Sequence, residues 1–287
     1  MAASSASSSV QQARQSLANR LGEIRREAGL TGRDLAAACG WHPSKSSRIE
    51  NARTSPSADD IRAWCRICGA EAQVDDLLAS LRAVEGMFVE WRRMERSGLR
   101  QAQEARWPLY ERTHRFRSYS SWLVPGLIQT RAYTSAVLHS IRERRGLMDD
   151  VQGAVEERME RQRVLYDGHR RFAFLVEESV LRTGLGGTEV MAGQLGHLLT
   201  VGSLPNVSMG VVPMSPDRAR WPAESFWIYD AAQVNVELIS GYLTITQPSE
   251  VSMYAETFAE LAALAVYGAR ARSLITAAID ALAWGRR

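Results

Sequence analysis

The hydrophobic positions of the first 30 residues recur with the period of an amphipathic helix. Four apolar residues at that spacing, followed by a glycine that is a natural stop signal, predict a first helix over about 14–28: Leu17, Leu21, Ile24, Ala28 and Gly29. The residues before this helix are rich in Ala and Ser. Residues 1–13 are therefore predicted to be a disordered tail.

Three further short helices are predicted up to residue 70. Thr31 can cap the second helix, with Asp34 at the capping-box position three residues on, and Gly40 ends it. A tight turn follows, and the third helix begins at His42 or Pro43, because proline is tolerated in a first turn. The inner face of the fourth helix is predicted to hold Ile61, Trp64, Cys65 and Cys68. Two short helices joined by a glycine-containing turn are typical of a helix-turn-helix.

Residues 74 to about 104 have the periodicity of one long helix with a broad apolar face. We assign 14–80 to an all-α domain and 81–104 to a helical connector. Within the connector, the segment Trp91-Arg92-Arg93-Met94-Glu95-Arg96 is predicted to be a solvated helix face. A flank that contacts the DNA backbone and a part of a dimer contact are the alternatives for the same six residues.

Beyond residue 105 the pattern changes to short runs rich in β-branched and aromatic residues. These runs predict strands at 172–176, 207–212, 225–229, 234–238 and 242–246. Helical periodicity predicts helices over 129–142, 151–165, 188–203 and 249–283. The last three strands lie close together in the sequence, which predicts an antiparallel meander. Residues 105–287 are thus predicted to form an α+β domain with a small antiparallel sheet.

The composition is that of an ordinary globular protein, with 45% hydrophobic and 23% charged residues among 287. No run approaches the roughly 18–20 apolar residues of a membrane helix, so no membrane association is expected. Three cysteines, all before residue 70, favour a reducing cytosol over a disulfide scaffold. The strong preference for Arg over Lys is the bias of a GC-rich bacterial genome.

The net charge of +3 is small, but residues 11–70 hold ten basic side chains against six acidic ones. The second helix of a helix-turn-helix enters the major groove of DNA with its N-terminal residues on base edges. Five side chains are predicted to contact DNA, the first three on bases and the others at the groove edge or on phosphate: Ser44, Ser47, Arg48, Lys45 and Arg53. Lys45 is the only lysine of the chain.

A set of spaced residues in this region resembles the Xre, or phage-repressor, family of five-helix DNA-binding domains over about 60 residues: Gly29-Leu30-Thr31, Asp34-Leu35-Ala36, Gly40, Ser44 to Glu50, Arg53 and Pro56-Ser57. The resemblance implies a structural ion pair between Arg25 and Glu50, which ties the first helix to the recognition helix. We also count Thr31 and Pro43, at the starts of the second and third helices, among the residues that contact DNA.

Three residues depart from the family pattern. Gly32 and Pro43 stand where the family usually has glutamines that contact phosphate and bases, so the expected readout shifts to the serines and Arg48. Ala52 replaces the usual glycine after the recognition helix, which predicts strain in a left-handed turn.

Two other interpretations fit the same region. A helix bundle in a basic domain can serve protein contact instead of DNA binding. Cys39-x2-His42 and Cys65-x2-Cys68 have the pair spacing of a zinc site, although these cysteines also fit the apolar faces of their helices as small hydrophobic residues. We expect no metal and no cofactor.

The C-terminal two-thirds holds no recognisable catalytic motif. The glycines of Gly184-x-Gly186-Gly187 precede a predicted helix start, which does not fit a phosphate-binding loop after a strand. Glu177-Glu178 lies at a strand end, where paired carboxylates can act as acid and base, but adjacent acids on a surface turn are more often solvated. We expect no enzymatic activity.

Several segments are similar to actinobacterial regulators of the WhiJ-like group: Trp122-Leu123-Val124-Pro125-Gly126-Leu127-Ile128-Gln129-Thr130, Tyr133, Arg158-x4-Arg163, Pro205-Asn206-Val207-Ser208 and the Glu237/Gly241 region. The C-terminal domain of these regulators has no assigned activity. They are commonly encoded beside a very small BldB-like protein, in an arrangement reminiscent of antitoxin and toxin. The resemblance therefore implies a transcriptional regulator whose C-terminal domain binds such a partner.

The leading prediction is a sequence-specific regulator that binds double-stranded DNA at a palindromic operator. A homodimer is expected, because one short recognition helix reads too few base pairs. The alternatives are a ligand-sensing repressor, with a small-molecule pocket in residues 105–287, and an enzyme with a DNA-binding head. The expected location is the cytoplasm, on the nucleoid.

Overall fold

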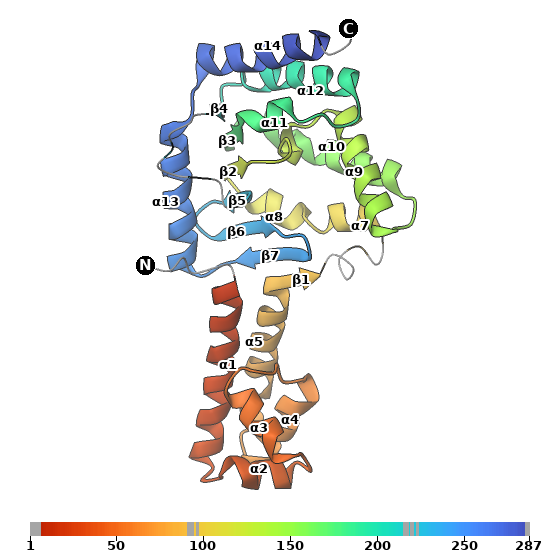
Figure 1. Ribbon diagram of the computed structural model, residues 1–287. Helices are drawn as coiled ribbons and strands as arrows, with labels where there is room; N and C mark the ends of the chain where they lie inside the picture. The colour runs from red at the N-terminus through yellow and green to blue at the C-terminus, as the bar shows by residue number, and fades with distance from the viewer. Residues whose placement is uncertain are drawn as a thin grey trace. The chain divides into compact units, whose positions relative to one another are not determined.

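The chain divides into two units, of which the computed structural model describes residues 7–90, 95, 98–214, 218, 221 and 224–284 (Figure 1). The N-terminal unit comprises Met1–Val89 and Tyr242–Ile245. The C-terminal unit comprises Glu90–Gly241 and Thr246–Arg287. Along the described residues, no helix is both long enough and apolar enough to cross a membrane.

Helices make up most of the described N-terminal unit: α1 (Ser7–Glu27), α2 (Gly32–Ala38), α3 (Pro43–Glu50), α4 (Ala58–Ile67), the 3-10 helix η1 (Glu71–Gln73) and α5 (Val74–Met87). They pack around one apolar core whose most deeply buried members come from α1 to α4: Leu21, Ile24, Leu35, Ile49, Ile61 and Trp64. The indole Nε1 of Trp64 donates to the carbonyl oxygen of Leu21 at 3.1 Å, so the largest buried side chain of this unit is also satisfied as a donor.

The first helix begins earlier than the sequence pattern indicates. α1 starts at Ser7, inside the segment predicted to be a disordered tail, and residues 1–6 of that segment lie outside the described residues. Gln11 and Arg14 have good helix propensity, and a helix that is already nucleated by packing further along extends through such residues at little cost.

The prediction of one long helix through the connector was wrong. α5 ends at Met87, a short strand β1 (Phe88–Glu90) follows, and the next helix among the described residues, α7 (Leu99–Glu104), starts after Gly98. Gly98 has a φ of +102°, which a helix interior does not allow. Of the segment predicted to be a solvated helix face, only Glu95 is among the described residues; it is 5% exposed and paired with Arg145, so it is not solvated.

The strands of the C-terminal unit are β2 (Arg115–Ser120), β3 (Arg171–Glu177), β4 (Val207–Val212), β5 (Phe226–Tyr229) and β6 (Gln233–Glu237). They lie in the order β6-β5-β2-β3-β4. β5 pairs antiparallel with β6 and with β2, whereas β2-β3 and β3-β4 are parallel. A further strand, β7 (Gly241–Ile245), lies beside β1 in the strand order.

The α+β class is therefore confirmed, but the sheet is mixed and not simply antiparallel. Parallel neighbours require long crossover connections, usually helical. The β2-β3 crossover contains η2 (Gly126–Ile128), α9 (Arg131–Arg145), α10 (Val151–Arg161) and η3 (Gln162–Tyr166). The β3-β4 crossover contains α11 (Glu178–Arg182) and α12 (Thr188–Val201). The other helices in the described part of this unit are α7 (Leu99–Glu104), α8 (Trp107–Arg112), α13 (Pro248–Leu264) and α14 (Gly268–Trp284).

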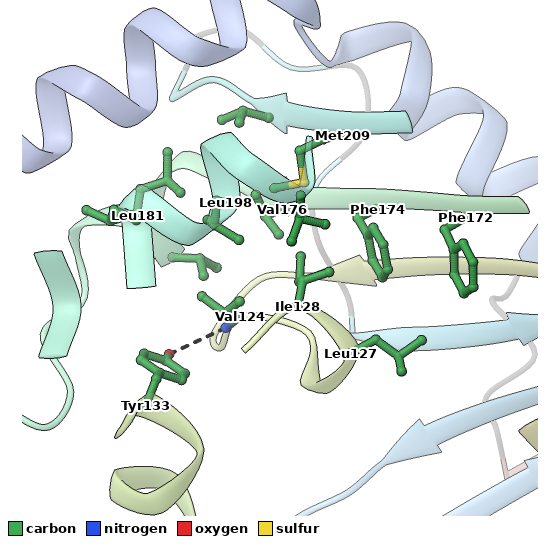
Figure 2. Close-up of a cluster of buried hydrophobic side chains, with 14 of the residues drawn as sticks. Val124, Leu127, Ile128, Tyr133, Phe172, Phe174, Val176, Leu181, Leu198 and Met209 are labelled. Carbon is green, nitrogen blue, oxygen red and sulfur yellow. Dashed lines mark hydrogen bonds between the residues drawn. The ribbon is translucent and has the colours of Figure 1, made fainter. Parts of the chain in front are cut away.

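The main core of the C-terminal unit lies between this sheet and its crossover helices (Figure 2). Alternate residues of β3 point the same way, so Phe172 and Phe174 stack with their ring centroids 6.1 Å apart. In the turn before α9, the backbone N–H of Val124 donates to the hydroxyl of Tyr133 at 3.4 Å, the bond drawn in Figure 2. This bond anchors the turn to α9.

Candidate nucleic-acid interface

The α2–turn–α3 segment is fixed by local capping. The hydroxyl of Thr31 accepts from the backbone N–H of Asp34 at 3.2 Å, and the Asp34 carboxylate accepts from the backbone N–H of Thr31 at 3.0 Å. This is the capping box predicted from the sequence. Gly40 follows α2 with a φ of +68°, and His42 then caps α3 by accepting from the backbone N–H of Ser44.

Helix α3 has one face held in the core and one face exposed. Ser46 and Ile49, three residues apart, are buried; the Ser46 hydroxyl donates to the carbonyl oxygen of Gly32 at 2.8 Å, which ties α3 to the start of α2. The exposed side chains at the i, i+3 and i+4 positions are Ser44, Ser47 and Arg48. The three residues predicted to face bases therefore share one solvent-facing stripe.

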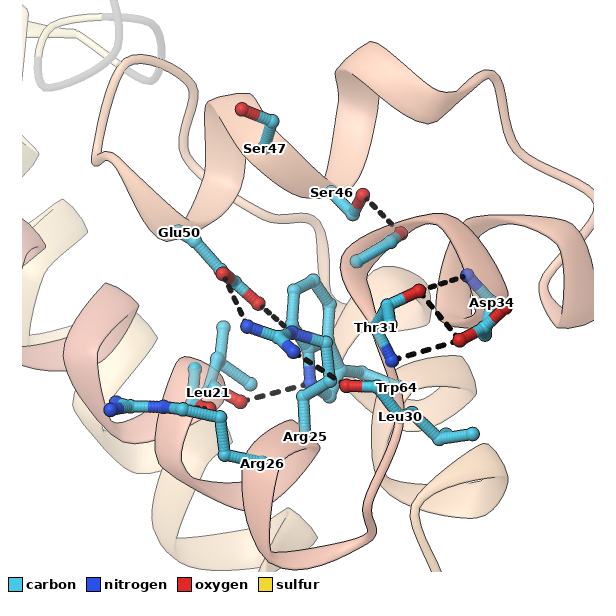
Figure 3. A network of polar contacts seen from close by, with 12 residues as sticks. Leu21, Arg25, Arg26, Leu30, Thr31, Asp34, Ser46, Ser47, Glu50 and Trp64 are labelled. Carbon is cyan, nitrogen blue, oxygen red and sulfur yellow. Dashed lines mark hydrogen bonds and ion pairs between the residues drawn. The ribbon is translucent and has the colours of Figure 1, made fainter.

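Arg25 of α1 and Glu50 of α3 form a two-point ion pair (Figure 3). The guanidinium donates to the carboxylate oxygens from Nε at 2.5 Å and from Nη2 at 3.0 Å. Its Nη1 donates to the carbonyl oxygen of Leu30 at 2.5 Å, at the entry to α2. The contact with Glu50 raises the pKa of Arg25 above its usual range. One arginine thus fixes the orientation of both helices of the motif relative to α1.

Lys45 differs from the other predicted contact residues. Its Nζ lies 2.6 Å from a carboxylate oxygen of Asp60 in α4 and 4.5 Å from the ring centroid of Trp41. Its ammonium is therefore engaged inside the domain, and the pair braces α3 against α4. An Arg48 guanidinium on the exposed stripe is better placed to reach DNA.

The other predicted contact residues are all exposed. Thr31 and Pro43 lie at the first turns of α2 and α3, although the Thr31 hydroxyl is engaged in the capping box. Arg53 follows α3, and its backbone N–H donates to the carbonyl oxygen of Arg48 at 2.9 Å. Ala52, which lies between the end of α3 and Arg53, has a φ of +50°. The chain turns there in the left-handed region, as expected where the family has glycine.

Sequence reasoning missed one residue of this surface. Asn51 is exposed one turn after Ser47, and its Nδ2 donates to the Ser47 carbonyl oxygen at 2.7 Å. With Gly32 and Pro43 it lines an open groove of about 680 Å³ between α2 and α3. An asparagine can pair with adenine through both of its polar atoms. The i, i+4 spacing from Ser47 was the signal for it.

The cysteines of this unit are free thiols packed with its core. Burial raises the pKa of Cys39 and Cys65, and it raises that of Cys68 to about 11. Among the described residues, no group of three or more His, Cys, Asp or Glu side chains is gathered where it could hold a metal ion.

The carboxylates at the end of β3 are buried, contrary to the solvated turn expected from the sequence. Glu177 accepts from the Tyr119 hydroxyl at 2.6 Å and from both terminal nitrogens of Arg218 at 2.9 Å. Glu178 pairs with Arg182 at 2.7 Å. Each carboxylate is thus neutralised by an arginine.

Residues 16–81 match a family model described as a helix-turn-helix domain, which covers α2, α3 and the helices around them. The N-terminal unit is therefore a DNA-binding helix-turn-helix. Residues 109–277 match the family "Domain of unknown function (DUF5753)". This second match spans more than half of the chain, so the chain belongs to that family.

No curated protein matches the chain. Among solved structures, that of TrmBL2, an archaeal chromatin protein, aligns with 83% of this chain and 88% of its own chain at 11% identity. The TM-score of that alignment is 0.31, which does not establish a shared fold.

Proposed function

We propose that this protein is a sequence-specific transcriptional regulator of the Xre type that reads double-stranded DNA with the exposed stripe of α3. The observation that carries the proposal is the division of α3 into a locked face and a free one. Ile49 and Ser46 hold it to the core, Glu50 orients it through Arg25, and Ser44, Ser47 and Arg48 face outward. Hydroxyls can bond any base, and an arginine can grip guanine at two atoms.

The proposal includes a homodimer on a palindromic operator, because one eight-residue helix spans few base pairs. Two such helices placed about 34 Å apart would read successive major grooves. Light scattering of the purified chain is expected to give twice the monomer mass. A monomer that also binds its operator as a monomer would contradict this part of the proposal.

The resemblance to WhiJ-like regulators supports a further part of the proposal, that the C-terminal domain binds a small BldB-like protein in an antitoxin-like arrangement. We assign no catalytic role to either unit and place the regulator on the nucleoid in the cytoplasm. Purification from the native host, followed by mass spectrometry of what comes with the chain, tests the partner. A regulator that binds its operator but brings no small protein would refute it.

The test of base reading is Arg48→Ala on an operator selected from random duplexes. Loss of the guanidinium is expected to cost about 1–3 kcal/mol of operator affinity and to relax the preference at one base pair. The matched control is Arg62→Ala, which removes one exposed arginine charge from α4, where Arg62 pairs with Asp59. Equal, small losses in both variants would show that Arg48 reads no base.

A further inference from the structure

The C-terminal unit contains a cavity of about 130 Å³ on one face of its sheet. Its floor is a row across three neighbouring strands. Ser118 of β2 stands opposite Trp227 of β5, and Trp227 stands opposite Asn235 of β6. All three residues line the cavity. Because cross-strand partners share a face of the sheet, the row presents two polar side chains on either side of an indole.

Helices and one turn form the walls. α9 supplies an apolar wall of Val137, Leu138 and Ile141. The turn that contains Val124 and Gly126 forms another side, and Figure 2 shows how Tyr133 holds Val124 in place. The polar walls come from α7 and α10, which pack against each other.

Four arginines line this small space: Arg106, Arg145, Arg158 and Arg161. Two of them meet carboxylates, since Arg145 pairs with Glu95 and Arg106 lies 3.4 Å from Glu237. Arg161 is 3% exposed; it donates to the backbone and side-chain oxygens of Gln103 at 2.7 and 2.8 Å. These contacts leave the cavity with more positive than negative charge.

Arg158, like Arg161, donates to amide oxygens in the cavity. Its Nη1 donates to the amide oxygen of Gln129 at 3.0 Å, and its Nε lies 3.3 Å from the amide oxygen of Gln103. Both acceptors are neutral, and no carboxylate of the described chain is within ion-pair distance of Arg158. Burial, with the like charges of Arg161 and Arg106, outweighs the opposite charge of Glu237 and lowers the pKa of Arg158 to about 9. An anion beside it would reverse that penalty.

The amide that holds Arg158 is itself fixed. Gln129 is 2% exposed; its nitrogen donates to the Val124 carbonyl oxygen at 2.7 Å, and its oxygen also accepts from the Thr134 hydroxyl at 3.1 Å. Arg158 is thus positioned before any ligand arrives. Preorganisation of this kind lowers the entropy cost of binding.

A second observation points to a ligand independently of the charges. The hydroxyl of Ser118 is buried, with the residue 1% exposed, and has no hydrogen-bond partner among the described residues. A buried hydroxyl without a partner costs free energy. A polar atom of a ligand in the cavity would satisfy it.

We propose that this cavity binds a small organic carboxylate with an apolar body. The carboxylate accepts from Arg158, the body packs on Trp227 and the α9 wall, and a polar atom reaches Ser118. The single positive charge of Arg158 suits a monoanion. A small inorganic ion is a poor match, because it would lose hydration beside the apolar wall and gain no favourable contact there.

The test is calorimetric titration of the full chain with benzoate and with hexanoate. Both are expected to bind with millimolar or lower Kd, whereas benzamide and hexanamide, which keep the shape without the charge, bind at least tenfold more weakly. Inorganic phosphate is expected to bind more weakly than either carboxylate. Absence of carboxylate binding, equal binding of the amides, or tighter binding of phosphate would overturn the proposal.

Variants locate the binding. Arg158→Gln should weaken benzoate at least tenfold, while Arg163→Gln, which removes a 77% exposed side chain from η3, leaves it unchanged. Gly126→Val tests the same point without removing the charge: a Cβ on Gly126 would lie in ordinary contact with the Arg158 Nη1, at 4.0 Å, and the two γ-methyl groups of valine would take up space beside the guanidinium. If Gly126→Val and Arg158→Gln each bind benzoate as tightly as the original chain, the site is refuted.

This inference does not rest on the proposed DNA-binding function. Benzoate binding needs no operator, and operator binding by α3 needs no ligand. A chain that binds benzoate but no specific DNA would refute only the proposed function, and the reverse result would refute only the carboxylate site.

Discussion

In the N-terminal unit Arg25 meets the carboxylate of Glu50 at two points, whereas in the C-terminal unit Arg158 meets only the amide oxygens of Gln103 and Gln129 among its hydrogen-bond partners in the described chain. In the first arrangement the ion pair holds α1 and α3 together. The side chains available to a partner are then the exposed ones of α3. The second leaves a half-buried guanidinium without a carboxylate at hydrogen-bond distance in the described chain. Arg25 therefore serves the scaffold, whereas Arg158 is the arginine that we propose to meet a ligand.

The largest expected effect comes from breaking the paired case. Glu50→Ala leaves the Arg25 guanidinium, whose side chain is 14% exposed in the intact pair, without its carboxylate. Loss of one partner of a fully buried pair costs about 3–5 kcal/mol, and we expect about 2–3 kcal/mol here because both side chains keep some contact with water. Hydrogen exchange of the α1 and α3 amides, resolved by peptide mass spectrometry, measures this locally.

The control for this prediction is a double variant, Arg25→Met with Glu50→Met. Replacing both charges by apolar side chains of similar length removes the pair without stranding either partner, so protection should recover by more than half. Protection in Glu50→Ala equal to that of the unmodified chain would show that the pair does not hold the motif together.

The helical N-terminal unit was predictable from sequence because its signals are local. The capping boxes Thr31/Asp34 and Ser57/Asp60 and the stop at Gly40 each involve residues a few positions apart. The inward turn of Lys45 was not predictable, since its partner Asp60 lies 15 positions along the chain. A basic residue at the start of a recognition helix has the same sequence appearance whether it is free or paired.

The C-terminal unit was predictable only in part, because its defining contacts are long-range. β2 was missed: its run Arg-Phe-Arg-Ser-Tyr-Ser is too polar to resemble a buried strand. The parallel pairing of β2 with β3 depends on the crossover helices. The cavity depends on hydrogen bonds from Arg158 to Gln103 and Gln129, which belong to separate elements. The spacing of these residues in the sequence does not predict the contacts.

A second, smaller effect tests another ion pair of the N-terminal unit, between Lys45 and Asp60. Burial opposes ionisation of Asp60, but hydrogen bonds from Lys45 and Ser57 together hold its pKa below the usual value of 3.8. Asp60→Asn is expected to cost about 1–2 kcal/mol near neutral pH, where the carboxylate is charged. Exchange protection of α3 and α4 measures it.

The pH dependence has a definite sign. A lowered folded-state pKa contributes stability that is present above pH 3.8 and lost as the pH falls through the folded-state pKa. The difference between the original chain and Asp60→Asn should therefore shrink as the pH falls from 5 to 3. Asp59→Asn is the matched control. The Asp59 carboxylate is next to Asp60 in the chain, but its side chain is 93% exposed. A difference that stays constant down to pH 3 would rule out the ion pair as its source.

The smallest expected effects concern one residue in each unit whose backbone has a left-handed conformation. Ala52 after α3 and Asp230 after β5 are non-glycine residues in the left-handed region, with φ of +50° and +54°. The Asp230 carboxylate accepts from the backbone N–H groups of His114 at 3.1 Å and Arg115 at 2.8 Å, which compensates its strain. Ala52 has no side-chain polar atom to do the same.

Glycine should therefore act in opposite directions at the two positions. Asp230→Gly relieves strain but loses both hydrogen bonds, so a net loss of about 1 kcal/mol is expected. Ala52→Gly removes the Cβ penalty against a greater entropy loss on folding, and a net gain of about 0.5 kcal/mol is expected. Thermal melting of each variant measures the sign. If Ala52→Gly melts below the original chain, the left-handed turn after α3 stores no strain, and the alanine there is no burden on the helix-turn-helix.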